Sequence, residues 1–189
     1  MSQQEGRFTK ARVEAFSDGV IAVIITIMVL DLRAPTSDRL DDLLKLWPSF
    51  ASYLVSFIFA AVYWINHHAE IAKARRMTPG LIWANNLLLF CMSLFPFATA
   101  YVASSRLSPV AMVFYGCVQF ACALSFALLD LVIAGQRKGD SAFEKERQAV
   151  FWKNLCSKIL YALAIPAGYF SPVAALLIFG GIGVLYVVP

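Results

Sequence analysis

The sequence predicts an all-α, polytopic membrane protein with six transmembrane helices, and two properties of the whole chain support this prediction. Hydrophobic residues make up 60% of the 189 residues and charged residues 15%, and the mean hydropathy is +0.69. The apolar stretches are about 20 residues long and are distributed along the whole chain, so each can cross a bilayer as a helix. Little sequence remains for a separate soluble domain, and we expect residues 1–189 to form one transmembrane domain.

The first predicted span covers residues 13–32, where Thr26 is the only polar side chain between positions 19 and 30. Such a run belongs in lipid or inside a bundle of membrane helices. A signal peptide is the alternative, because basic residues precede the run. Asp18 interrupts the apolar core and residues 31–35 are a poor small-residue cleavage site, so we predict a retained helix.

Five further spans are predicted after the first, at residues 49–68, 81–104, 109–134, 153–169 and 172–188. Pro96 should kink the third span, because it removes a backbone donor from the helix. The longest polar segment, residues 136–148, is predicted to be a cytoplasmic connection. Within it, residues 143–147 form either a surface helix or the early part of the fifth span. A short amphipathic helix outside the membrane is expected at residues 38–44.

Basic residues predict the orientation of these helices. Most of the 16 Lys and Arg residues fall on one side of the six predicted spans. By the positive-inside rule this side is cytoplasmic, so both termini are expected in the cytoplasm of a cell whose plasma membrane holds the protein. The residues on this side are Arg7, Lys10, Arg12, Lys73, Arg75, Arg76, Arg137, Lys138, Lys145, Arg147, Lys153 and Lys158.

The sequence lacks the motifs of several functional classes. The four cysteines lie within or at the ends of apolar spans, without the Cys or Cys/His spacing that suits zinc, and we expect them to pack there. His67 and His68 are adjacent, so their side chains point ~100° apart on a helix and make a poor chelate. No catalytic Ser/His/Asp order, phosphate loop or nucleic-acid motif is present. We therefore predict no enzyme, no structural metal, no cofactor and no nucleic-acid partner.

A polar layer is predicted at the cytoplasmic ends of the first three spans. Asp18 lies ~9 Å along the first helix from Arg12, and an ionised carboxylate at that depth needs donors. We predict a buried network that ties the first span to the second and third. An alternative is a proton relay, which would make the protein a small proton-linked carrier using Asp18, His67 and His68. The candidate members are Arg12, Phe16, Ser17, Asp18, Asn66, His67, His68, Asn85 and Asn86.

The first span also carries a stripe of residues at helical spacing. Its members are Gly19, Val23, Thr26, Ile27 and Leu30, at i, i+4, i+7, i+8 and i+11. Asp18 lies ~140° around the helix from Val23 and is therefore off this stripe. From the residues alone, the stripe is either a packing surface of small and apolar side chains or the lining of a pathway.

The first span resembles the signature first helix of one family. Its motif is Arg12, then Phe16-Ser17-Asp18, followed by an apolar run that ends at Leu32. The family comprises the bacterial relatives of the lysosomal potassium channel transmembrane protein 175. Residues 64–68, with Trp, Asn and two His, resemble its second helix, and residues 86–96 its third.

This resemblance implies a potassium-permeable cation channel that assembles as a homotetramer in membrane lipids. Four copies of the first helix would line one central pore without a re-entrant carbonyl filter. The family's hydrophobic constriction would fall on Val23 and its hydroxyl layer on Thr26, with further narrow levels at Ile27 and Leu30. Val23 is smaller than the isoleucine or leucine usual at its position.

Overall fold

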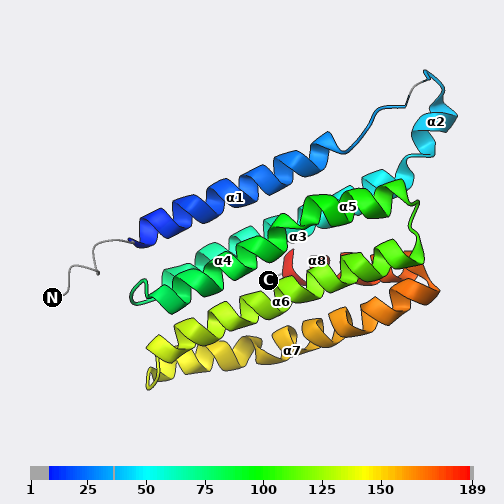
Figure 1. Cartoon of the computed structure of the whole chain (residues 1–189). Coiled ribbons are helices and arrows are strands. Elements are labelled where there is room, and N and C mark those ends of the chain that lie inside the picture. Colours follow the sequence, from blue (N-terminus) through cyan, green and yellow to red (C-terminus); the bar gives the residue numbers. More distant parts are fainter. Residues whose placement is uncertain (1–8, 36, 188–189) are drawn as a thin grey trace.

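The computed structural model describes residues 9–35 and 37–187, and in these residues it is built from eight α-helices (Figure 1). Arg7 and the last position of the sixth predicted span, 188, lie outside the described residues. The helices are α1 (Lys10–Leu30), α2 (Leu40–Leu44), α3 (Trp47–Lys73), α4 (Pro79–Ser93), α5 (Phe95–Ser104), α6 (Pro109–Gln136), α7 (Ser141–Phe170) and α8 (Pro172–Val187).

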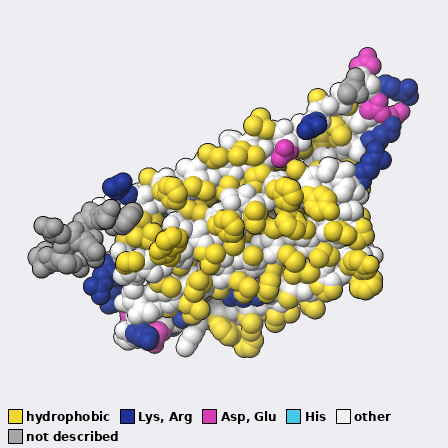
Figure 2. Space-filling model, viewed as in Figure 1, with side chains coloured by type: hydrophobic (Ala, Val, Ile, Leu, Met, Phe, Trp, Pro, Cys, Tyr) yellow, Lys and Arg dark blue, Asp and Glu magenta, His cyan; other side chains and the backbone are white. Residues whose placement is uncertain are grey.

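The long helices run side by side, and α1 forms one edge of the bundle (Figure 1). α1 packs against α3, α4 and α5; α6 packs against α4, α5 and α7; and α8 packs against α3 and α7. α7 therefore lies on the side of the subunit away from α1. Apolar side chains cover much of the visible surface between the two ends, and charged side chains gather mainly at the ends (Figure 2). This distribution fits a bundle whose sides face lipid.

Four parts of the described chain are long and apolar enough to cross a membrane: α1, α3, α4 together with α5, and α6. They correspond to the first four predicted spans. α8 is apolar but has only 16 residues. α7 is long enough, but charged side chains make its first half too polar to join the four. The fifth and sixth spans therefore remain predictions.

The third predicted span is two helices rather than one. Leu94 ends α4 and precedes α5, and Pro96 occupies the first turn of α5. A proline inside a helix removes one backbone hydrogen bond and clashes with the carbonyl four residues earlier. The predicted kink at Pro96 is confirmed as an interruption of the helix at Leu94.

The segment predicted as a polar connection, residues 136–148, is mostly helical. α6 continues to Gln136, and α7 already begins at Ser141. Gly139 takes φ +81°, a left-handed conformation that favours glycine and lets the chain reverse. Asp140 caps α7, since its Oδ1 accepts a hydrogen bond of 3.2 Å from the backbone N–H of Phe143. Of the two alternatives, residues 143–147 are thus the early part of the fifth predicted helix.

Candidate functional site

α1 has one face packed into the subunit and one face left open. The helix begins after Thr9, whose hydroxyl accepts a hydrogen bond from the backbone N–H of Arg12. Its packed face repeats at helical spacing, which buries one residue on each turn against α3, α4 and α5. The buried residues are Val13, Ser17, Ile21, Ile24 and Met28.

A buried hydrogen-bonded group joins α1 to α3 and α4 near the start of α1. Nδ2 of Asn85 donates to Oγ of Ser17 at 3.1 Å, and Oδ1 of Asn85 lies 2.6 Å from Nε2 of His67, which donates to it. Ser17 also donates to the carbonyl of Val13 at 2.8 Å. Each of the three linked side chains is at most 1% exposed. We call Ser17, His67 and Asn85 the inner network.

Asp18 does not belong to the inner network, which differs from the prediction. Its side chain is exposed and accepts a hydrogen bond of 2.9 Å from Nε1 of Trp64 on α3. Exposure removes the desolvation cost that a buried ionised carboxylate would carry. Trp64 belongs to the predicted motif of the second helix, but its position in the sequence does not reveal that it is the donor.

The other predicted members also lie outside the inner network. Asn66 donates to the carbonyl of Val62 on its own helix at 2.8 Å. His68 is exposed and Asn86 is partly buried, and no hydrogen bond joins either side chain to another described residue. Arg12 and Phe16 are exposed at the start of α1, where Phe16 is 59% exposed. Neighbouring positions point ~100° apart on a helix, which explains why one of each adjacent pair turns inward and the other does not.

The residues of the alternative proton relay are not joined. Asp18 is bonded to Trp64 and His67 to Asn85, while His68 faces outward. Within the described part of the chain, no hydrogen bond or ion pair links any two of the three. A relay needs such links or a water between the groups, so the direct contacts do not favour the carrier.

The open face of α1 carries the stripe of predicted pore residues. Val23 is 54% exposed, Ile27 44% and Leu30 78%, and Thr26 is exposed between them. Oγ1 of Thr26 donates to the carbonyl of Val23 at 2.9 Å. Its proton is therefore used within the helix, and the oxygen lone pairs remain available to a cation at the open face.

Two groups of ion pairs at the end of the bundle where α3 ends and α7 begins were not predicted from the sequence. Lys73 lies 3.3 Å from Glu70 on its own helix and 2.9 Å from Glu146 on α7. In the second, Asp130 near the end of α6 accepts hydrogen bonds from Nε and Nη2 of Arg147 on α7 at 2.9–3.2 Å. The Lys73–Glu146 contact joins helices distant in sequence, whereas Arg147 and Asp130 lie on the consecutive helices α7 and α6. The acidic residues at the ends of apolar spans were the signal for these contacts in the sequence.

A second buried polar group lies deeper in the subunit. Oγ of Ser56 on α3 is 2.7 Å from Oγ1 of Thr99 on α5 and 3.0 Å from the Tyr115 hydroxyl on α6. Gln119 donates to the same Tyr115 hydroxyl at 2.9 Å. These bonds fix three helices relative to one another behind α1. In the sequence, this polar group is indicated only by hydroxyl and amide side chains within apolar spans.

Comparisons with known proteins agree with the motif in α1. The sequence profile of the endosomal/lysosomal potassium channel TMEM175 matches residues 12–96, which include the three helices of the inner network. A potassium channel of Chryseobacterium sp. (strain P1-3) is 35% identical over 181 residues, covering 96% of this chain and 94% of its own. The chain belongs to the TMEM175 family. The predicted resemblance is thereby confirmed.

A solved member of the TMEM175 family has the same fold. The crystal structure of a lysosomal potassium-selective channel TMEM175 homolog from Chamaesiphon minutus superposes with a TM-score of 0.82 at 28% identity, covering 94% of this chain and 96% of that chain. The endosomal/lysosomal proton channel TMEM175 of Bos taurus is 28% identical over 130 residues, which are 62% of this chain and 27% of that protein. The fold is thus that of a membrane channel family.

Proposed function

We propose that this protein is a potassium-permeable channel, in which four copies of the chain surround one central pore lined by α1. The open stripe of α1 carries this proposal. α1 stands at the edge of the subunit, and Val23, Ile27 and Leu30 are 54%, 44% and 78% exposed there. A stripe left open on one subunit makes a ring when closed symmetry repeats it.

The chemistry of the stripe fits a pore without a carbonyl filter. Val23 and Leu30 are separated by about 10 Å along the helix axis, so four copies would place several apolar rings one above another. Such rings close a pore by dewetting. Thr26 lies between them, and its oxygen would replace part of the hydration shell of K+. Family membership supports this assignment over lipid-facing packing, since three of the relatives are named potassium channels.

The topology completes the proposal. We propose that α7 and α8 provide the fifth and sixth spans, and that the end bearing Arg75, Arg76, Arg137 and Lys138 faces the cytoplasm of a cell whose plasma membrane holds the tetramer. Both termini then lie on the cytoplasmic side. The alternative of a proton-linked carrier has no supporting contact among the described residues.

Ion flux through liposomes containing the purified protein tests the proposal. Thr26→Val should bring the preference for K+ over Na+ close to one, and Thr26→Ser should retain it because the hydroxyl remains. Ser93→Ala is the matched control. Ser93 is also an exposed hydroxyl that donates to a carbonyl of its own helix, at 2.7 Å, but it lies on α4. Unchanged selectivity in Thr26→Val would refute the hydroxyl ring.

The oligomeric state tests the pore itself. Native mass spectrometry of the protein in mild detergent should give the mass of four chains. A stable monomer that still conducts ions would exclude a pore made from four copies of α1.

A further inference from the structure

Two turns at the same end of the subunit are fixed to each other by one glutamine. Gln136, the last residue of α6, accepts hydrogen bonds from the backbone N–H groups of Arg75 at 3.1 Å and Arg76 at 3.2 Å. Its Nε2 donates to the carbonyl of Arg76 at 3.2 Å. The turn between α3 and α4 is therefore held against the turn between α6 and α7.

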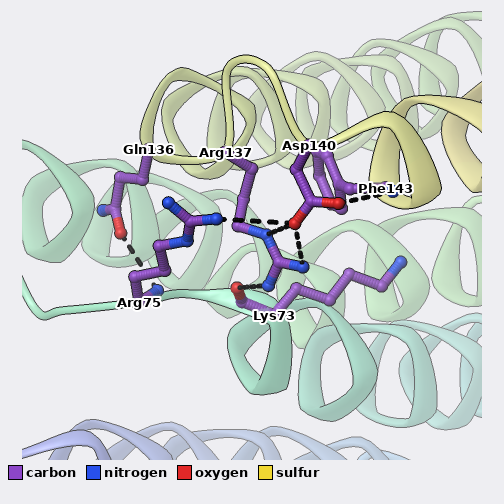
Figure 3. A network of polar contacts seen from close by, with 6 residues as sticks. All are labelled: Lys73, Arg75, Gln136, Arg137, Asp140 and Phe143. Carbon is purple, nitrogen blue, oxygen red and sulfur yellow. Dashed lines mark hydrogen bonds and ion pairs between the residues drawn. The ribbon is translucent and has the colours of Figure 1, made fainter.

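Arg137 strengthens this connection (Figure 3). Its guanidinium donates to the carbonyl of Lys73 at 3.1 Å and to Oδ2 of Asp140 at 2.7 Å. The backbone N–H of Phe143 and the Arg137 guanidinium lower the pKa of the Asp140 carboxyl below its usual value. Asp140 is thus ionised at neutral pH and already used by Arg137.

The two turns carry more basic side chains than acidic ones. Arg75 lies 3.5 Å from the same Asp140, and its side chain is 56% exposed. Arg76 and Lys138 are exposed, and no carboxylate among the described residues forms an ion pair with either. Arg75 and Arg137 therefore share the Asp140 carboxylate, while Arg76 and Lys138 add two further positive charges to the same two turns, whose backbone is fixed. Like charges held together repel one another, and a bound anion would relieve this repulsion.

The position of this surface restricts the kind of anion. The surface lies at the ends of three apolar helices, where α3 and α6 end and α4 begins. α3 and α6 are each long enough to cross a membrane, as is α4 together with α5. One turn into α4, Trp83 is 74% exposed, and exposed tryptophans of membrane proteins concentrate at headgroup level. The surface is thus at the depth of lipid phosphates.

We propose that Arg75, Arg76 and Lys138 form a binding site for the phosphate of an anionic phospholipid. An arginine guanidinium binds phosphate oxygens with two parallel hydrogen bonds, and a lysine adds a compact charge. Basic residues at the ends of membrane helices attract anionic lipids. Because the bonds of Gln136 and Arg137 fix both turns in advance, the lipid does not have to order them.

Lipid binding to the full-length protein in detergent tests this site. Native mass spectrometry would measure retention of phosphatidylglycerol against phosphatidylcholine. The double variant Arg76→Gln/Lys138→Gln should weaken phosphatidylglycerol binding about twenty-five-fold, at roughly fivefold for each residue. Arg33→Gln/Arg39→Gln removes the same charge from the opposite end of the subunit and should leave the preference close to that of the unaltered protein.

Three results would overturn the lipid site: an unchanged lipid preference in the first double variant, an equal loss in both double variants, or displacement of phosphatidylglycerol by millimolar inorganic phosphate. The last would assign the surface to a soluble anion. The binding readout requires no ion flux, so a failed lipid site leaves the proposed channel standing, and a failed channel leaves the lipid site standing.

Discussion

Asn85 is the side chain on which the inner network depends, because it bonds to both other members. Asn85→Leu keeps a similar volume in a site that is 1% exposed but removes the bonds to Ser17 and His67. A hydrogen bond between membrane helices contributes about 0.6 kcal/mol on average. The imidazole nitrogen left unpaired in the core costs about 1–3 kcal/mol more. We therefore expect Asn85→Leu to lower the free energy of unfolding by about 2–4 kcal/mol.

Reversible unfolding in mixed detergent, followed by circular dichroism at fixed protein concentration, measures this loss. Asn86→Leu is the matched control. Asn86 is the next residue on the same helix and has no hydrogen-bond partner among the described residues, so its substitution should change stability by no more than about 0.5 kcal/mol. A cycle with Ser17→Ala should give a coupling of about 0.6 kcal/mol with Asn85. Equal effects of the two leucine substitutions would refute the assignment of the network.

Two further predictions concern the ends of the later helices. Gly183→Ala should destabilise the protein by about 1–3 kcal/mol, because a Cβ there would lie 2.9 Å from a side chain of α3. The control Gly181→Ala should be neutral or slightly stabilising, because the space around Gly181 is open. Thermal unfolding compares the two variants. Asp140 has a lowered pKa in the folded state, so its ionic contribution is present above its unfolded pKa and is lost as the pH falls below about 4. The stability difference between the unaltered protein and Asp140→Asn should vanish over that acid range, and a difference that persists there would contradict the assigned contacts.

Periodicity was sufficient to divide α1 into two faces. The angular positions of Val23, Thr26, Ile27 and Leu30 predict one common stripe, and the structure leaves all four exposed while Ser17 is buried opposite them. This agreement follows from the regular geometry of a long helix, in which angular position depends on sequence spacing alone. The proposed pore function of the stripe rests on the family, because an exposed apolar stripe suits a pore and a packing surface equally well.

Periodicity was insufficient for contacts between helices. The sequence offers two adjacent asparagines and two adjacent histidines, and only the rotation of α3 and α4 about their axes selects Asn85 and His67. That rotation depends on how all the neighbouring helices pack. The same limit applies to Asp18, whose donor Trp64 lies 46 positions away. Local polarity likewise led to a predicted fifth span shorter than α7. Charged side chains on the first turns of α7 form ion pairs with side chains of α3 and α6, so these turns do not depend on solvent alone.

The structure divides α1 into a hydrogen-bonded part and an open stripe, and we predict that their effects can be separated. Ser17, which is bonded to Asn85, and Thr26, on the open stripe, are nine positions apart and so lie about 13 Å apart along the axis. Substitutions at this distance without shared partners usually add in their effects. Asn85→Leu should therefore reduce stability while the K+ preference of the surviving channels stays unchanged, whereas Thr26→Val should reduce the preference without reducing stability. The double variant should show both effects at their separate magnitudes, because the anchor of α1 and its proposed ion-contacting surface share no side chain.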